Sequence, residues 1–513
     1  MLLLVKLSLL IGVASAARIL GVVLTPGYSH QAFFKPFWRE LSLRGHQVTT
    51  ITTHPIKDAK LVNLTEIDLG TFADDTQGHM HKIVELGDTN LARQVRYMFT
   101  NALPTVDKLL GFPPVRELID DKDARFDLVI LEHLWNSILP FAVRFNCPYI
   151  GMLTIDAPNA MLKKVGNPIH SSLFPDNLLP FGDGPTLTER VSSFLYELGY
   201  NNVYLEMEEL EKELVEKHFG SDYPPIREMA ENISLLFVNA DPIFHHNRPL
   251  VPAVVQIGGD GFHRSPPRPL PQDIQLVLDA ATGGFIYFSL GTNVRSEFLG
   301  EKTIDMMLGV FAELPFTVLW KFGGNISRKP RNVVVAKWLP QEDVLRHPNI
   351  KLFITQGGQQ SMDEAIQSHV PMLGIPFFGD QPFNVRKMVN RGFGLGLNYK
   401  NLERESFRQA IVEVIGNSKY RNTVTKLAQL ARDQPMSGLE KAIWWTEYVI
   451  RHKGAKHLRS PLLDLPWYQY LLLDVIGALL LGLSLSLLTI AFVCRSLIRL
   501  VRKKSTSSEK KSS

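Results

Sequence analysis

The chain has 513 residues, of which 45% are hydrophobic and 21% charged, with a formal net charge of +4. The segment after Cys494 holds seven Lys or Arg and one Glu, which gives it +6 and leaves −2 for the rest of the chain. This balance gives no reason to expect a nucleic-acid partner. The sequence also has no His-x-x-x-His spacing and only two cysteines, so we expect no metal site.

The first 16 residues have the composition of a signal peptide. Lys6 is their only charge, the run 7–13 is mostly apolar, and Ala14-Ser15-Ala16 has the small-x-small form of a cleavage site. The apolar run is too short to span a bilayer.

The N-terminal half alternates strands and helices. Apolar runs predict buried strands at 18–24, 47–52, 126–131 and 149–153, and an amphipathic run predicts a helix at 33–44. Residues 160–230 are rich in Glu and Lys at helical spacing and predict a helical excursion. Strands alternating with helices indicate a doubly wound parallel sheet. We therefore expect an N-terminal domain over 17–257.

His30 is the candidate general base of this half. It follows the first predicted strand, and ligands bind beyond the carboxyl ends of the strands in such sheets. An imidazole with a pKa near neutral is suited to take a proton from a hydroxyl.

A proline-rich segment, 258–271, predicts an interdomain linker. Beyond it, strands are predicted at 285–289, 318–321, 333–337, 352–355 and 372–375. The fold class is therefore α/β, with a second doubly wound domain over 272–459.

Residues 338–384 are the most distinctive stretch. They include Trp338-Leu-Pro-Gln341, Gln356-Gly-Gly-Gln-Gln-Ser361, Glu364 and Asp380-Gln381. Glycines after the strand at 352–355 let the backbone approach a phosphate, and the helix that follows offers N–H groups at its N-terminus. The pattern indicates a site for a phosphate group.

A second apolar run, 475–494, predicts a transmembrane helix after a juxtamembrane segment, 460–474. It carries no charge, over a length that matches a hydrocarbon core of about 30 Å. Aromatic residues precede it and basic residues follow it: Trp467, Tyr468 and Tyr470, then Arg495, Arg499, Arg502, Lys503 and Lys504. Positive flanks favour the cytosolic side. We expect a single-pass type I protein with a luminal body and a cytosolic tail, 495–513.

The tail ends Lys510-Lys511-Ser512-Ser513, which resembles the dilysine retrieval signal of endoplasmic reticulum membrane proteins. With Cys494 at the membrane boundary, Cys147 has no luminal cysteine to pair with. Glycosylation sequons begin at Asn63, Asn232 and Asn325.

The stretch 338–384, the turn Phe288-Ser-Leu-Gly-Thr292 and the pre-membrane segment 435–459 resemble the UDP-glycosyltransferases, and among them the arthropod-type members. The resemblance covers essentially the whole chain. It implies the GT-B arrangement, in which two Rossmann-like domains face each other across a cleft. The N-terminal domain would bind the acceptor and the C-terminal domain the UDP-sugar.

The resemblance implies roles in the donor site. Trp338 and Gln341 would contact the uracil, and Glu364 the ribose, although Glu364 could instead form a capping box with Ser361. Asp380 and Gln381 would bind sugar hydroxyls. The diphosphate would be held by residues of two turns: Ser289, Thr292, Gln356, Gly358, Gln360 and Ser361. Gln356 stands where most vertebrate members have His, so we expect a phosphate contact there without proton chemistry.

The resemblance also implies a catalytic pair. His30 matches the family's base, and Glu132 stands where the family usually has the Asp that orients it. We expect an inverting displacement that needs no metal and no cofactor beyond the UDP-sugar co-substrate.

The expected function is detoxification-type transfer of a hexose, from UDP-glucose, to a hydroxyl of small lipophilic acceptors. The expected location is the endoplasmic reticulum membrane, in contact with its lipid. The sequence does not decide whether the protein forms a homo-oligomer. One alternative is a glucuronosyltransferase that uses UDP-glucuronate. Another is a membrane-anchored binder of lipophilic molecules that has lost catalysis. The differences from the family's His and Asp at Gln356 and Glu132 would permit this alternative.

Overall fold

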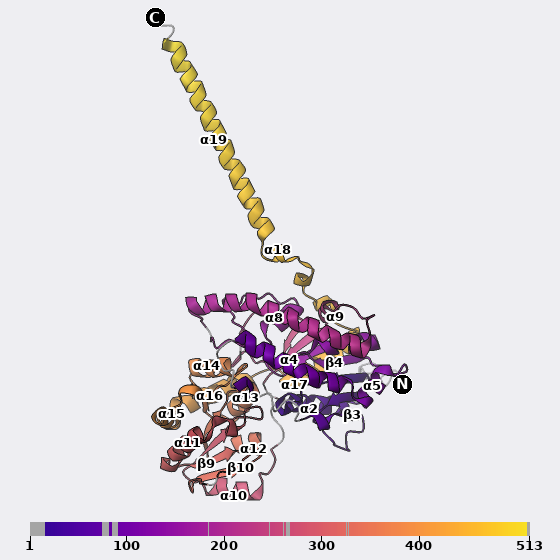
Figure 1. Cartoon of the computed structure of the whole chain (residues 1–513), viewed down its shortest axis with the longest axis vertical. Helices are drawn as coiled ribbons and strands as arrows, with labels where there is room; N and C mark the ends of the chain where they lie inside the picture. Colours follow the sequence, from indigo (N-terminus) through magenta and orange to yellow (C-terminus); the bar gives the residue numbers. More distant parts are fainter. Residues whose placement is uncertain are drawn as a thin grey trace, which may run out of the picture. The chain divides into compact units, whose positions relative to one another are not determined.

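The computed structural model describes residues 16–73, 82–84, 91–182, 184–245, 247–259, 261–262, 267–324, 326 and 328–509. The chain forms two compact units, Met1–Ser460 and Pro461–Ser513. The first unit contains two parallel sheets with helices on their faces (Figure 1). The expected fold class, α/β with two Rossmann-like domains and a C-terminal apolar helix, is confirmed.

The N-terminal sheet has seven parallel strands in the order β3-β2-β1-β4-β5-β6-β7. The strands β4 (Leu128–Glu132), β5 (Tyr149–Leu153) and β6 (Leu235–Val238) are buried along their whole length, as strands covered on both faces must be. The other strands are β1 (Arg18–Val22), β2 (Gln47–Thr52), β3 (Leu64–Asp68) and β7 (Val254–Gln256). The sequence analysis predicted β1, β2, β4 and β5 but not β3, β6 or β7.

Helices cover both faces of this sheet. Helices α4 (Leu91–Leu110) and α8 (Leu187–Phe219) contact each other along one side (Figure 1). The remaining helices are α2 (Tyr28–Leu43), α5 (Pro113–Asp120), α6 (Pro140–Phe145), α7 (Asn159–Lys164) and α9 (Ile226–Glu231). The helical excursion predicted at 160–230 corresponds to α7, α8 and α9.

Helix α2 begins five residues before the predicted helix, at Tyr28 rather than residue 33. Gly27 is its N-cap, and its one internal proline, Pro36, does not end it. His30 therefore lies in the first turn of a helix, not in a loop.

The C-terminal sheet has six parallel strands in the order β10-β9-β8-β11-β12-β13. Its strands are β8 (Phe285–Ser289), β9 (Thr317–Lys321), β10 (Val333–Ala336), β11 (Ile350–Thr355), β12 (Met372–Gly374) and β13 (Gly394–Gly396). Its helices are α10 (Gln272–Ala280), α11 (Glu301–Glu313), α12 (Gln341–Leu345), α13 (Gln359–Gln367), α14 (Gln381–Arg391), α15 (Arg404–Gly416) and α16 (Ser418–Arg432). Five of these strands were predicted, and β13 was not.

The segment expected to end the C-terminal domain returns to the N-terminal sheet. Helix α17 (Gly438–His452) packs against α2, and its Ala442 and Ile443 share a core with Ile19 and Phe37. The chain thus crosses between the sheets a second time, within the range 272–459 predicted for one domain.

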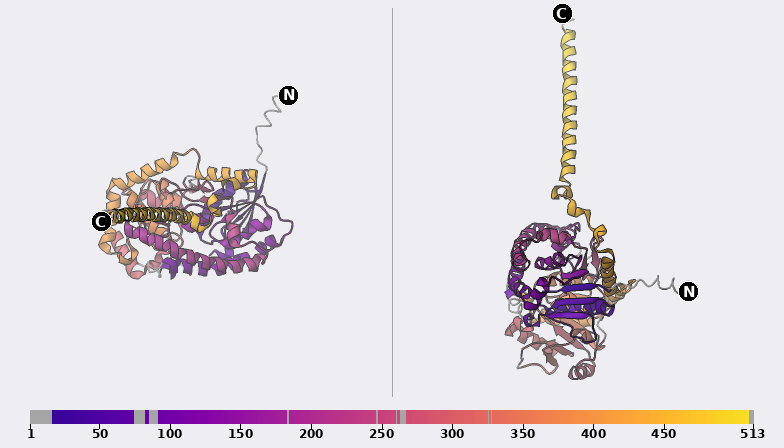
Figure 2. Two further views of the ribbon diagram at one scale, coloured as in Figure 1. Left: turned by 90° about the horizontal axis from the view of Figure 1, so that it is seen from above. Right: turned by 90° about the vertical axis from the view of Figure 1, so that its right-hand side faces the viewer.

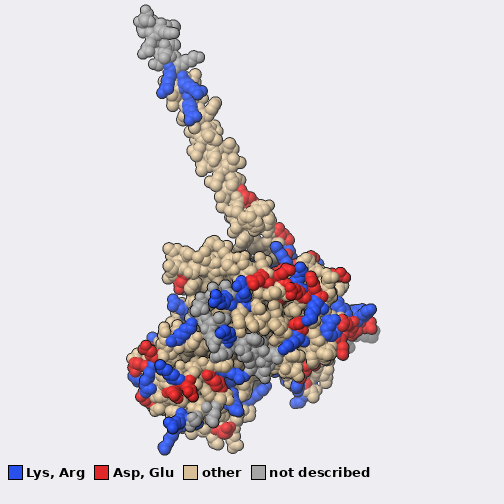
Figure 3. Space-filling view, viewed as in Figure 1, with Lys and Arg blue, Asp and Glu red and all other residues tan. Residues whose placement is uncertain are grey.

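In the second unit, α18 (Trp467–Tyr470) precedes the long helix α19 (Leu473–Glu509). Residues Leu473–Arg502 are long and apolar enough to cross a membrane, and they contain the predicted span 475–494. Figure 3 shows most of this stretch as an uncharged surface, with blue side chains only toward its far end. Figure 2 shows α19 as one straight helix.

Several predicted features lie outside the described residues: residues 1–15 of the signal peptide, Asn325, Lys510 and Lys511. Of the other sequons, Asn232 is exposed at the end of α9, whereas the Asn63 amide donates to Ser42 O at 3.3 Å.

The return of α17 can be tested at its first residue. A Cβ on Gly438 would lie 2.0 Å from the backbone oxygen of Ile257, whereas a Cβ on Gly416 would meet nothing within 4 Å. Forced overpacking of this kind costs about 1–3 kcal/mol. We expect Gly438→Ala to lower the melting temperature of the detergent-solubilised protein by several degrees, and Gly416→Ala not to lower it. Equal melting temperatures for the two variants would contradict this packing.

Candidate active site

His30 and Glu132 are hydrogen-bonded to each other at the carboxyl edge of the N-terminal sheet. His30 Nδ1 lies 2.8 Å from Glu132 Oε1, and 20% of the His30 side chain is exposed against 0% for Glu132. Thr25 N–H donates to the other carboxylate oxygen at 2.9 Å. The carboxylate is therefore held on both oxygens, and one ring nitrogen of His30 is directed to it.

A third side chain contacts the same ring nitrogen. Thr154 Oγ1 lies 3.0 Å from His30 Nδ1, just after β5. When Nδ1 carries the proton toward Glu132, the lone pair of Nε2 is left to accept a proton from another group. The sequence analysis missed Thr154, although a polar residue directly after a buried strand was a usable signal.

The residues expected at the nucleotide meet in the C-terminal domain. The Gln341 amide donates to Ser361 Oγ at 2.9 Å and to Glu364 Oε2 at 2.7 Å. Its oxygen accepts from Tyr287 OH at 3.2 Å. The Trp338 ring is 53% exposed. This arrangement offers an open aromatic face next to a set of polar groups whose positions are fixed.

The Trp338 ring is contacted from two sides. Lys321 Nζ lies 4.5 Å from its centroid, a cation–π contact, and also donates to Gly291 O at 3.1 Å. Tyr28, from the N-terminal domain, packs edge-on at 4.9 Å between centroids. Both side chains narrow the space over the indole.

Burial shifts the charges near this site. It raises the pKa of the Glu364 carboxyl to about 8 and lowers the pKa of the Lys321 ammonium to about 8. The charged form of each group is disfavoured because it has lost water. A ligand that donates hydrogen bonds to Glu364 would favour its ionised form.

Two glycine-containing turns lie beyond β8 and β11. Gly291 and Gly357 have positive φ, 81° and 82°, which favours glycine. Gly291 N–H donates to Ser289 Oγ at 3.3 Å, and Gly358 is the N-cap of α13. The turns bring backbone N–H groups and a helix N-terminus to one place, as anion sites do. Thr292 is half-buried in the first turn.

Gln356 lies between these turns. Its side chain is buried, and its Oε1 has no hydrogen-bond partner among the described residues. A buried amide oxygen without a partner is unfavourable, and a ligand bound at this loop would relieve that cost. Gln360 is already engaged, because its amide donates to Ser29 O of the N-terminal domain at 2.8 Å.

Asp380 and Gln381 lie at the start of α14. Asp380 accepts from the Asn384 amide at 2.6 Å, and burial raises the pKa of its carboxyl, while the nearby His30 opposes that rise. Gln381 Oε1 accepts from the Phe377 and Phe378 N–H groups at 2.9 and 3.3 Å, which fixes the loop. Asn384, missed by the sequence analysis, also donates to Gly357 O at 3.0 Å.

A sequence profile described as UDP-glucoronosyl and UDP-glucosyl transferase matches residues 19–512. The chain belongs to this family. It is 35% identical to UDP-glucosyltransferase 2 of Dactylopius coccus, over 97% of this chain and 96% of that protein. It is 29% identical to human UDP-glucuronosyltransferase 2B7, over 96% and 95%. The chain is thus a UDP-glycosyltransferase.

Solved structures support the fold. The glycotransferase of kitacinnamycin superposes with a TM-score of 0.58 at 18% identity, over 85% of this chain and 99% of that one. The forosaminyltransferase SpnP superposes with a TM-score of 0.56 at 16% identity, over 85% and 100%. The GT-B arrangement is therefore confirmed.

No cluster of three or more His, Cys, Asp or Glu that could hold a metal lies among the described residues. The polar groups of this UDP-glycosyltransferase site are amides, hydroxyls, backbone N–H groups, the Lys321 ammonium, the His30 imidazole and the carboxyls of Glu132, Glu364 and Asp380.

The raised pKa of Glu364 predicts a pH effect on stability. Because its folded pKa, about 8, exceeds its ordinary value of 4.5, the protonated form favours folding. This stabilisation is complete below about pH 4.5 and is lost as pH rises through about 8. Glu364→Gln stays neutral, so its melting temperature should fall less than the wild type's between pH 6 and pH 9. If the melting temperatures of the wild type and Glu364→Gln fell equally over this pH range, the raised pKa of Glu364 would be contradicted.

Proposed function

We propose that this UDP-glycosyltransferase moves a hexose, from UDP-glucose, to a hydroxyl of small lipophilic acceptors, with inversion and without a metal. The supporting observation is that the His30–Glu132 pair of one domain lies beside the start of α13 in the other, where the Gln360 amide donates to Ser29 O at 2.8 Å. The proposed base and the proposed donor site therefore lie next to each other.

The proposed step is a single displacement. His30 Nε2 takes the proton of the acceptor hydroxyl while that oxygen attacks the anomeric carbon. The bond from that carbon to the UDP oxygen breaks, and UDP leaves with the electron pair. Glu132 holds the imidazole in one tautomer and stabilises the imidazolium that forms.

In the donor site, the turns after β8 and β11 and the N-terminus of α13 would hold the diphosphate. Ser289, Thr292, Gln356, Gly358, Gln360 and Ser361 are the residues that we assign there. Trp338 and Gln341 would contact the uracil, and Glu364 the ribose hydroxyls. Lys321 adds a cation 3.1 Å from the oxygen of Gly291 in the first turn.

The base can be tested by His30→Ala. A positioned general base contributes about 10²–10⁴-fold, so turnover should fall by that factor. UDP affinity, measured by calorimetry, should stay within about twofold because the assigned UDP contacts lie in the other domain. A well-folded His30→Ala protein with wild-type turnover would refute the assignment.

The proposed preference for UDP-glucose over UDP-glucuronate rests on the charge of Asp380. Asp380 accepts hydrogen bonds from neutral hydroxyls, strongly when ionised, whereas a uronate would add a like charge unless a cation is near. Of the three cations on α14, Arg386 is exposed, Lys387 is buried over the Phe383 ring at 5.3 Å, and Arg391 donates to Ile243 O. The relatives include proteins named for either donor.

We expect turnover with UDP-glucose to exceed that with UDP-glucuronate. Asp380→Asn should lower turnover with UDP-glucose more than it weakens UDP binding. Arg386→Ala is the matched control and should leave the donor preference unchanged. A wild type that prefers UDP-glucuronate, and loses this preference in Arg386→Ala, would make the protein a glucuronosyltransferase.

We also propose that the body is luminal and the protein resides in the endoplasmic reticulum. The apolar stretch Leu473–Arg502 and the basic residues at its end support this orientation. Protease added to sealed microsomes should remove only the short tail. Digestion of the body would contradict the topology, and export after Lys510→Ser with Lys511→Ser would support retrieval.

A further inference from the structure

One face of α13 is polar, buried and turned toward the N-terminal domain. Gln359, Asp363 and Gln367 follow each other at intervals of four, which places them on the same side of the helix. Gln359 and Asp363 are 4% and 0% exposed. Nothing in the proposed reaction uses this face, although Gln359 begins the helix whose N-terminus is the proposed diphosphate site.

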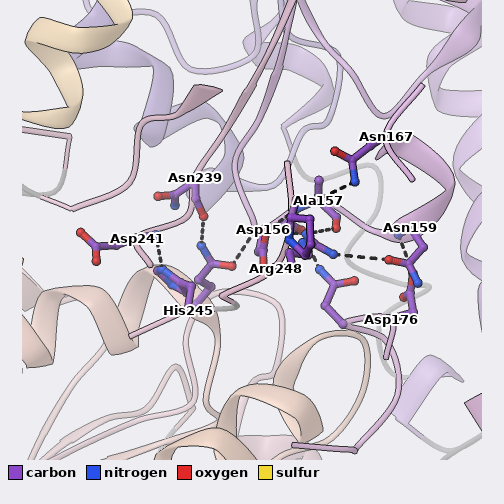
Figure 4. A network of polar contacts seen from close by, with 12 residues as sticks. Asp156, Ala157, Asn159, Asn167, Asp176, Asn239, Asp241, His245 and Arg248 are labelled. Carbon is purple, nitrogen blue, oxygen red and sulfur yellow. Dashed lines mark hydrogen bonds and ion pairs between the residues drawn. The ribbon is translucent and has the colours of Figure 1, made fainter. Parts of the chain in front are cut away.

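Gln359 joins the two domains through both of its amide atoms. Its Oε1 accepts from Asp156 N–H at 2.8 Å, and its Nε2 donates to Asn239 O. Asp156 follows β5 and Asn239 follows β6, so this side chain reaches the carboxyl edge of the N-terminal sheet. Figure 4 shows the contacts around Asp156, Asn239 and Arg248.

The same contacts continue to the base. The Asn239 amide donates to Thr154 O at 2.9 Å, and Thr154 Oγ1 lies 3.0 Å from His30 Nδ1. The donor-binding helix is therefore connected to His30 through two residues of the N-terminal domain. A shift of Gln359 would move the loop that carries Thr154.

The loop itself is braced. Arg248 donates to Asp156 Oδ1 at 2.7 Å, and the two side chains are 4% and 7% exposed. Arg248 also donates to Ala157 O. A buried charge pair with further hydrogen bonds holds its loop in one position, which gives Gln359 a rigid surface to contact.

Asp363 and Gln367 extend the contact along α13. His245 Nε2 lies 3.0 Å from Asp363 Oδ1. His245 Nδ1 accepts from Asp241 N–H at 2.8 Å, so the ring proton is on Nε2. The Gln367 amide donates to Gly259 O at 3.0 Å.

We propose that Gln359 and Asp363 are positioning residues, which fix the N-terminus of α13 relative to His30 so that the anomeric carbon and the acceptor oxygen align. This inference rests on the proposed role of His30. Such contacts act through alignment, where a displacement of about 1 Å can cost about 10²-fold in rate. The side-chain partners of Gln359, Asp156 and Asn239, are not among the residues that we assign to UDP.

The variants are Gln359→Leu, which keeps the size and removes both hydrogen bonds, and Asp363→Asn, which keeps the shape and removes the charge. Asn332→Leu is the control. The Asn332 amide donates to three backbone oxygens within the C-terminal domain, those of Phe311, Leu314 and Phe316. Asn332→Leu therefore removes comparable side-chain hydrogen bonds, none of which joins the N-terminal domain.

We expect Gln359→Leu to lower kcat at least tenfold per folded molecule, with the Kd for UDP within about twofold of wild type. Hydrogen exchange of the Asp156 amide should accelerate, because that N–H loses its acceptor. Asp363→Asn should lower kcat by a smaller factor, and Asn332→Leu should lose stability but keep kcat within twofold.

An unchanged kcat in Gln359→Leu, together with faster exchange at Asp156, would overturn the proposal, because the contact would then be broken without effect. A tenfold loss of UDP affinity that accounts for the whole change would also overturn it. If Gln359→Leu does not fold, the kcat and the Kd for UDP of Asp363→Asn decide in its place. Wild-type turnover in His30→Ala would instead refute the assignment of His30 as the base, regardless of the results with Gln359→Leu and Asp363→Asn.

Discussion

The pairing of His30 with the buried Glu132 carboxylate is the constraint on which the proposed chemistry depends. A carboxylate with no exposed surface is stable only when its oxygens are paired, and here His30 and the Thr25 N–H supply the two partners. Both partners come from the segment that follows β1, and Glu132 ends the adjacent strand β4. The order of strands in the N-terminal sheet therefore creates the contact, and α2 must begin as early as Tyr28 for His30 to reach it.

In the proposed function, the C-terminal half meets a different requirement, because it would have to bind an anionic nucleotide and then release it. Its described groups are mostly neutral donors: the turns after β8 and β11, the N-terminus of α13, and the amides of Gln341 and Gln356. The neighbouring Lys321 and Glu364 each carry less charge at neutral pH than they would in water, because burial shifts their pKa values toward each other. A site of this kind attracts a diphosphate without holding it through many permanent charges.

Several features could be predicted from the sequence because they depend on local pattern. The strands β2, β5 and β8 were predicted residue for residue. β5 and β8 are short apolar runs, whereas β2 is rich in β-branched residues and follows a turn at Gly45. The strands β7 and β13 have three residues each, too few for a period, and β3 is a polar edge strand with no buried residue. The pairing of Glu132 with His30 was predicted through the family resemblance, because both residues occupy positions set by strand ends.

Other features could not be read from the sequence, because they depend on how distant segments meet. Nothing in residues 438–452 alone shows that α17 shares a core with Ile19 and Phe37. The contacts of Gln359 with Asp156 and Asn239 arise only after both sheets have formed and faced each other. The same holds for Tyr28 against Trp338, which joins an aromatic residue of one domain to the proposed uracil site of the other.

The account's central claim is that a base in one domain drives a single displacement on a sugar held by the other. The anomeric configuration of the product tests it most directly. With UDP-α-glucose and a simple phenol, proton NMR of the product formed in the first turnovers should show only the β-glucoside. Formation of the α-glucoside would contradict a single displacement driven by His30.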